Sequence, residues 1–341
     1  MKSRPRHLAL RTLAVACVLG TVGAMPATAY AEGSVDGDEL VYEDNTKYDS
    51  ELTHSVDAWN DVGRIDVRGD DFWNLEDVDI YDVDRPDAGY YGVWVDSFGA
   101  DEIELNEPAM DPAGGFVKRS VVAHEMGHAL GLPHIDRKRA LMDTTRFYTD
   151  VPEAADIAKY REFYGSEKKT GTSKGAGGSG DASTKADAPH MEATWVTDFS
   201  DDAKLAGFAD NVFVGKVVAK KGQKPYGEKG QKAFGKSRIP ETQYSVEVEK
   251  SFKGDAEGTT TVNQQGGFQK GAAEPLLFDG DRMLKPGQTY LFATKENPEL
   301  GLQTLVPRHG NQPTKSAGSE KSSVTERWTD AVRDQIAPST R

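Results

Sequence analysis

A histidine-rich segment over residues 124–134 constrains this chain more than any other feature. It reads His-Glu-Met-Gly-His-Ala-Leu-Gly-Leu-Pro-His. On a helix, His124 and His128 lie about one turn apart on the same face, so both imidazoles can point at one metal ion. We expect that helix to end at Gly131, because a left-handed cap costs little without a Cβ. The chain can then bring His134 back to the same point.

The spacing predicts a catalytic zinc site. Three protein ligands, His124, His128 and His134, leave a fourth position for water, whereas structural zinc sites are closed. Bound zinc lowers the pKa of its water from about 16 towards 7 and polarises a carbonyl group, and Glu125 is placed to act as the general base. Asp136 is an alternative third ligand, two residues further on. The non-functional alternative is a surface helix that carries histidines by chance, although the chain has only 7 of them.

Residues 1–31 have the features of a secretion signal. Four basic residues precede an apolar run from Leu13 to about Met25, and Ala29-Tyr30-Ala31 is a small-x-small cleavage site, with Ala27-Thr28-Ala29 as the alternative. The apolar run is too short to cross a bilayer, so we expect a secreted, extracellular protein with no membrane segment in its mature form. Cys17, the only cysteine, lies within this signal. The mature chain therefore has no disulfide, and lipid attachment at Cys17 is the alternative interpretation.

Charge is distributed unevenly along the mature chain. Residues 32–165 carry 32 acidic and 12 basic side chains, whereas residues 166–341 carry 23 and 25. The acidic half argues against nucleic-acid binding, and we expect a monomer. The asymmetry also favours an intramolecular contact between the two halves. The Asp-rich stretch 66–87 is interpreted either as a calcium site or as a solvated loop.

Composition divides the mature chain into four parts. Residues 32–165 are expected to form an α+β domain, residues 166–190 a flexible Gly/Ser-rich linker, residues 191–310 a mainly β domain, and residues 311–341 a polar tail with a short amphipathic helix that packs on the β domain. The linker implies that the two halves are tethered but move freely. Periodicity predicts helices over 51–62, 116–130 and 154–164 and strands over 65–68, 92–95, 102–106, 211–219, 243–252, 259–263 and 289–293.

The first domain resembles the matrixin branch of the metzincins. The zinc motif is followed by Met142 within Ala140-Leu141-Met142, which is similar to the family's Met-turn, and residues 155–165 are similar to its closing helix. The resemblance implies a twisted sheet with three helices and a zinc-dependent endopeptidase that cleaves protein or peptide substrates. It also implies that Met142 supports the metal site from beneath without binding the ion. We expect the substrate to lie extended along an edge strand, with residues 99–106 as the candidate.

Three departures from the matrixin pattern limit what the resemblance implies. Residues 143–148 stand where the family carries a Pro-x-Tyr wall, so substrate preference cannot be carried over. Outside the motif only His54 remains in the mature first half, so the family's second, structural zinc is not expected. Latency through a cysteine is excluded in a mature chain without one.

The second domain is similar to the netrin and metalloproteinase-inhibitor OB-barrel family. The resemblance rests on residues 209–217, 244–254 and 287–292. The inhibitory mode of that family does not transfer, because this domain has neither the N-terminal cysteine nor a free amino end. Two functions follow as alternatives: a secreted zinc endopeptidase, whose β domain inhibits or targets it in cis, or a catalytically silent binding protein that acts through the β domain.

Overall fold

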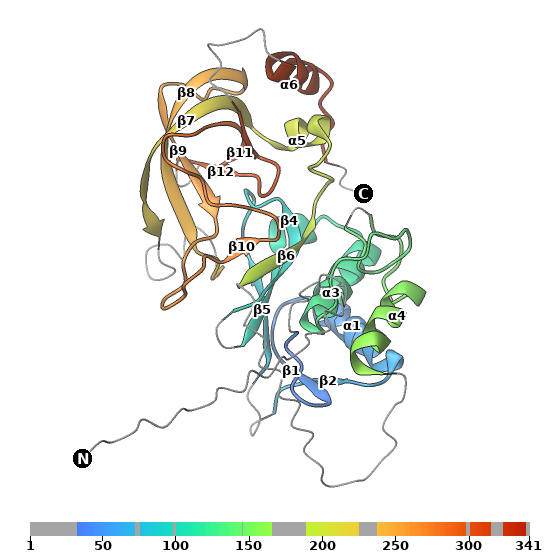
Figure 1. The fold of residues 1–341 in the computed structure, drawn as a ribbon. Helices are drawn as coiled ribbons and strands as arrows, with labels where there is room; N and C mark the ends of the chain where they lie inside the picture. The colour runs from blue at the N-terminus through green and yellow to red at the C-terminus, as the bar shows by residue number, and fades with distance from the viewer. Residues whose placement is uncertain are drawn as a thin grey trace, which may run out of the picture.

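The computed structural model describes residues 33–71, 76–97, 100–144, 146–165, 189–224, 237–297, 301–314 and 323–338. These residues form a mixed helix and sheet layer and a β-barrel that lies beside it (Figure 1). The predicted secretion signal and nearly all of the predicted linker fall outside the described residues. None of the helices in the described ranges has both the length and the apolar character needed to cross a lipid bilayer.

Five strands from the first half form the main part of the sheet beside the predicted zinc-binding helix. They are β1 (Glu39–Asn45), β2 (Asp66–Gly69), β3 (Val78–Val83), β4 (Tyr90–Val95) and β5 (Asp101–Asn106). Their spatial order is β2-β1-β3-β5-β4, and only β4 runs antiparallel to its neighbour. All residues of β3, β4 and β5 are buried, so both faces of this part of the sheet are covered.

Helices cover one face of this sheet. They are α1 (Asp49–Val62), the short α2 (Glu107–Met110), α3 (Gly115–Ala129) and α4 (Ala154–Tyr164). Between helices and sheet lies a core that includes Leu52, Trp59, Ile103 and Met126. Trp59 stacks on Tyr160 of α4 and donates a hydrogen bond from its indole N–H to the Ala123 carbonyl of α3 (2.9 Å). The long helices match the three that we predicted, and the α+β fold class is confirmed.

The second half contributes two further strands to the same sheet. Strand β6 (His190–Trp195) pairs antiparallel with β4, and β10 (Leu277–Phe278) pairs parallel with β6. Figure 1 shows β6 crossing beside β4, next to α3. Met191, Ala193 and Phe278 join Tyr81 and Val93 in a second core, on the face of the sheet away from the helices.

The remaining strands form a closed barrel. β7 (Asn211–Lys224), β8 (Glu241–Lys253), β9 (Thr259–Gln265), β11 (Thr289–Asn297) and β12 (Leu302–Leu305) pair in the order β12-β9-β8-β7-β11, and β12 closes back onto β11. The β9–β12 pair is parallel, and β13 (Asn311–Pro313) adds to β11 from outside. The predicted β-rich domain with barrel architecture is thus confirmed. Its membership of the netrin and inhibitor family stays a prediction.

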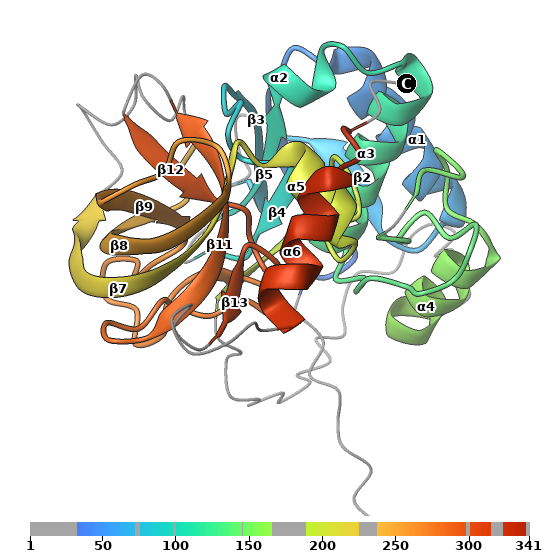
Figure 2. The same ribbon diagram turned by 90° about the horizontal axis from the view of Figure 1, so that it is seen from above.

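Two helices close one side of the barrel. α5 (Asp202–Phe208) and α6 (Ser323–Arg333) lie side by side against it (Figure 2). Trp328 of α6 is 1% exposed in a core shared with Leu205 and Leu291. The C-terminal amphipathic helix therefore packs on the β domain as predicted.

Buried charges join the two halves. The Arg85 guanidinium, fully buried before β4, lies 3.3 Å from Asp87 and 2.8 Å from Glu241 of β8. The Asp87 carboxylate also accepts a hydrogen bond from the Thr304 hydroxyl of β12 (2.6 Å). Burial works against the charged form of Arg85, yet these two carboxylates raise its pKa, so the guanidinium stays protonated. This interface contradicts the expectation of halves that move freely.

Two further expectations were wrong. The Asp-rich stretch 66–87 is not a solvated loop, since β2 and β3 lie within it and Asp79 and Asp82 are buried. Nor is calcium supported there, because in the described part of the chain the only side chains grouped to bind a metal are three histidines elsewhere. The second error concerns the substrate edge. Strand β5 lies between β3 and β4, so it is not an edge strand.

Candidate metal centre

Helix α3 positions the first two histidines, and its C-terminus redirects the chain towards the third. Gly131 has a φ of 75°. Its N–H donates to the His128 carbonyl (2.7 Å), and the Leu132 N–H donates to the Gly127 carbonyl (2.9 Å). This pair of bonds is the Schellman arrangement, which needs a left-handed residue just past the helix. Gly131 therefore ends the helix as predicted, and the reversal brings His134 to the same side as His124.

The three histidines converge through their Nε2 atoms. The Nε2 of His128 lies 3.1 Å from that of His124 and 3.2 Å from that of His134. The His124 and His128 Nδ1 atoms face the carbonyl oxygens of Leu141 (2.7 Å) and Leu132 (2.8 Å), respectively. A carbonyl accepts but cannot donate, so each Nδ1 carries the proton and each Nε2 presents a lone pair.

This arrangement fits a metal cation. Lone pairs that face one another at such distances repel unless a cation lies between them, and three imidazole nitrogens are a usual ligand set for catalytic zinc. Burial lowers the pKa of His124 to about 3 and that of His128 well below its usual value. Both rings are therefore neutral near pH 7, as metal ligands must be.

Met142 packs against α3 at Gly127, next to His128 in the sequence. It is completely buried, and its carbonyl accepts the Ile135 N–H (2.8 Å), which joins the turn to the segment that follows His134. A Cβ added to Gly127 would collide with the Met142 sulfur and approach Trp59 to 3.0 Å. Glycine at 127 therefore allows the methionine to pack against α3 between the first two histidines.

Asp156 holds the turn that carries Met142. Its carboxylate is fully buried and accepts the backbone N–H groups of Leu141 (2.8 Å), Met142 (3.1 Å) and Glu153 (2.8 Å). The Leu141 carbonyl in turn accepts from His124 Nδ1. One carboxylate on α4 thus fixes the backbone that sets the tautomer and orientation of the first histidine.

Glu125 lies beside the histidines and is fully buried against β4 and β6. A Cβ on Gly92 of β4 would come within 2.9 Å of the Glu125 Cγ, so glycine is what lets this side chain lie so close to the sheet. The Thr194 hydroxyl donates to Glu125 Oε1 at 2.6 Å, and the Thr194 N–H donates to the same atom at 3.2 Å. Burial raises the pKa of Glu125 to about 8, against the effect of these hydrogen bonds.

The third histidine has a partner from beyond the first domain. Glu192 of β6 lies 2.8 Å from His134 Nδ1. A carboxylate on the far nitrogen fixes the ring orientation and leaves Nε2 free for a metal. Asp136, the alternative ligand, is exposed and is not part of the histidine group. His134 is therefore the residue that completes the cluster.

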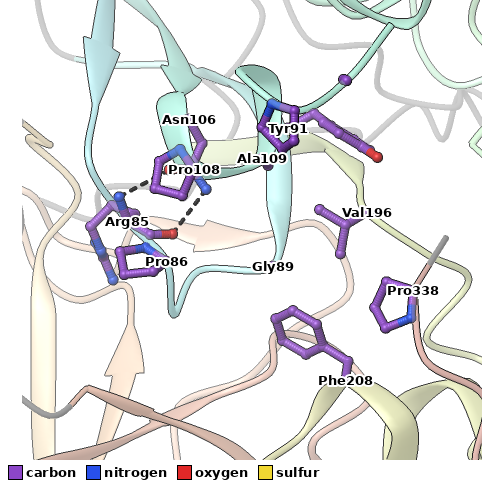
Figure 3. Close-up of a pocket in the computed structure, with 12 residues that line it drawn as sticks. Arg85, Pro86, Gly89, Tyr91, Asn106, Pro108, Ala109, Val196, Phe208 and Pro338 are labelled. Carbon is purple, nitrogen blue, oxygen red and sulfur yellow. Dashed lines mark hydrogen bonds between the residues drawn. The ribbon is translucent and has the colours of Figure 1, made fainter. Parts of the chain in front are cut away.

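Residues 146–148, which follow the Met142 turn, are more exposed than the buried histidines His124 and His128. In the segment that departs from the matrixin pattern, Arg146 and Tyr148 are exposed, whereas Phe147 packs edge-on against Tyr91 of β4 (5.6 Å between ring centres). Tyr91 also lines a pocket of about 270 Å³, together with Pro86, Pro108, and Phe208 and Pro338 of the second half (Figure 3). No histidine of the cluster lines this pocket.

Sequence reasoning missed Asp156, Glu192 and Thr194. Asp156 carried a local signal, since it stands at the third position of a helix whose capping box includes Glu153. Glu192 and Thr194 carried none, because Thr194 is 69 residues from the Glu125 that it contacts. The alternation of polar and apolar residues in β6 is typical of a strand, but it does not indicate which strand is its partner.

Metzincin metalloproteases are characterised by three histidines, two of them on one helix, together with a methionine turn that packs near that helix and a mixed sheet beside it. Residues 27–165 match the model of the matrixin family. This part of the chain is a matrixin-like metzincin catalytic domain, and a catalytic zinc is implied by that family. No curated protein matches the chain. The family match ends at residue 165, before β6 and the barrel begin.

Proposed function

We propose that the protein is a secreted zinc endopeptidase that hydrolyses peptide bonds of extracellular proteins. The observation that carries the proposal is the convergence of the Nε2 atoms of three histidines on one point, with the Nδ1 atoms of His124 and His128 held by carbonyl oxygens. Secretion rests on the features of residues 1–31, which lie outside the described residues.

His124, His128 and His134 would hold the ion. When bound, zinc supplies the acidity of a coordinated water and the polarisation of the scissile carbonyl. Glu125 would serve as the general base that takes a proton from the attacking water and passes it to the leaving amine. Asp156 and Glu192 keep the first and third imidazoles in the tautomer that leaves Nε2 available.

A catalytically silent binding protein is the alternative. It would leave Glu125 without a role, although Gly92 makes room for this side chain next to the cluster. Glu125 is buried, but this does not favour the silent protein. The hydrogen bonds that cap Glu125 come from one strand of the second half, β6, and not from the catalytic segment itself.

The test uses the full chain and two separate measurements. Metal content is measured by mass spectrometry, and cleavage is measured on unfolded casein and on a quenched peptide library, with and without a chelator and with zinc restored. Glu125→Gln is expected to retain zinc and to lose at least about a hundredfold in turnover, the contribution typical of general base catalysis. A matched variant, Glu162→Gln on the exposed face of α4, is expected to behave like the parent. Turnover that persists in Glu125→Gln would refute the assignment.

A further inference from the structure

The edge of the catalytic sheet is occupied by the protein's own chain. Within the matrixin-like segment, β4 is the last strand of the sheet and pairs on one side only, with β5. Its other side is taken by β6, which starts 25 residues after the family match ends. An unpaired strand edge is where an extended peptide adds by main-chain hydrogen bonds. Strand β6 therefore fills the edge nearest to the histidine cluster.

The register of β6 points its polar side chains towards His134 and Glu125. Opposite Trp94 stands Glu192, and opposite Gly92 stands Thr194. Both point to the α3 side of the sheet, where they contact His134 and Glu125. The alternate residues, Met191 and Ala193, lie in the core on the other side.

Thr194 blocks the residue that we propose as the general base. Two donors of one residue, the hydroxyl and the backbone N–H, meet at Glu125 Oε1. Oε1 therefore already has two donors, and Oε2 is buried away from solvent, so neither oxygen is open to an attacking water in this arrangement. Glu125 is also fully buried in this arrangement, so a peptide cannot approach it while β6 is in place.

We propose that residues 190–195 are an intramolecular inhibitory strand and that the folded chain is a latent peptidase. The strand occupies the position of an extended substrate on β4, and Thr194 caps Glu125. Activity requires β6 to leave β4, and an extended segment of a substrate protein then takes its place. This inference rests on the proposed peptidase function and adds how that function is restrained without a cysteine.

Substitution of Thr194 tests the cap. Thr194→Pro removes both donors to Glu125, whereas Thr194→Ser keeps both. We expect Thr194→Pro to cleave at least about tenfold faster than the parent, since two hydrogen bonds to a carboxyl group are lost, and Thr194→Ser to equal the parent. Equal rates for Thr194→Pro and the parent, at equal zinc content, would overturn the proposal.

A reversible staple provides a second test that does not depend on the folding of a proline variant. Val93 and Ala193 face each other across the two strands. The Asp96 N–H bonds to the His190 carbonyl, so alternation along the ladder makes 93 and 193 a non-hydrogen-bonded pair, close enough for a disulfide. Val93→Cys with Ala193→Cys, in a chain with Cys17→Ser, is expected to lose at least about tenfold in cleavage on oxidation and to regain it on reduction. Each single-cysteine variant is the control, and an oxidised form that cleaves as fast as the reduced form would overturn the proposal.

A probe that is bound but not cleaved separates the two proposals. A fluorescent peptide hydroxamate, which ligates zinc, is titrated against the zinc-loaded forms. Binding to the reduced form and to Thr194→Pro, but not to the oxidised form, supports the inhibitory strand even if no form cleaves a substrate, in which case the peptidase function alone fails. Equal binding to all forms would refute the strand and leave the peptidase function standing.

Discussion

Replacement of Asp156 by asparagine is expected to weaken the metal centre from a distance. The carboxylate accepts three backbone N–H groups through two oxygens, Oδ2 from Leu141 and Glu153 and Oδ1 from Met142. An asparagine keeps one carbonyl oxygen and turns an NH₂ group towards a backbone donor. At least one hydrogen bond to a charged group is lost, and the remaining ones weaken, which amounts to about 3 kcal/mol of folding stability.

The same substitution is expected to lower zinc affinity, because the Leu141 backbone links Asp156 to His124. Leu141 donates its N–H to Asp156 and accepts from His124 Nδ1 through its oxygen. Loss of such an outer partner costs roughly 10- to 100-fold in metal affinity. Zinc affinity is measured by competition with a chromophoric chelator, and stability by urea unfolding of the apo and zinc forms, with Glu162→Gln as the control. Unchanged zinc affinity in a destabilised Asp156→Asn would refute the link between the turn and His124, and no change in either quantity would refute the reasoning altogether.

Three other substitutions test the packing and the charges described above. Gly127→Ala is expected to destabilise the fold by about 1–3 kcal/mol, since its Cβ overlaps Met142, and to lower zinc affinity in the competition assay; a stability equal to that of the parent would contradict the packing argument. Arg85→Met leaves Asp87 and Glu241 buried without their cation and is expected to cost about 3–5 kcal/mol in urea unfolding, whereas a cost below about 1 kcal/mol would mean that the interface tolerates the two acids. Burial raises the pKa of Glu102 from 4.5 to about 7, so the folded state holds this proton more tightly than the unfolded chain. Protonated Glu102 therefore contributes on the order of 3 kcal/mol to the free energy of unfolding below about pH 4.5, and this contribution is lost as the pH rises through about 7. The measurement is urea unfolding between pH 5 and pH 8. An equal fall in stability in the parent and in Glu102→Gln would exclude this group as the cause.

The sequence predicts the grouping of the three histidines because its determinants are local. Helical spacing places His124 and His128 together, and the left-handed preference of glycine ends the helix at Gly131. The contact between Met142 and Ile135 is also local, because only a short turn separates these two residues in the sequence. These features depend on backbone geometry within about twenty residues, which a single sequence records.

The order of strands depends on contacts that no local pattern records. β3 contains acidic residues that suggested a solvated loop, yet Asp79 is neutralised by Arg238, which lies 2.7 Å away and comes from the second half. A buried acid is stable only with such a partner. The free edge was sought at β5, although β4 occupies that place and β6 covers it. The first error comes from a contact between the two halves, and the second from strand pairing within the first half.

The pairing of β6 with β4 also determines what a cut in the chain would do. A single break between Gly165 and His190 would separate the catalytic segment from the strand that covers it, yet the shared core around Tyr81 and Phe278 and the Arg85–Glu241 ion pair would still hold the pieces together. The contact would change from unimolecular to bimolecular, so its occupancy would depend on protein concentration. A nicked sample would then gain activity on dilution, whereas an intact one would not.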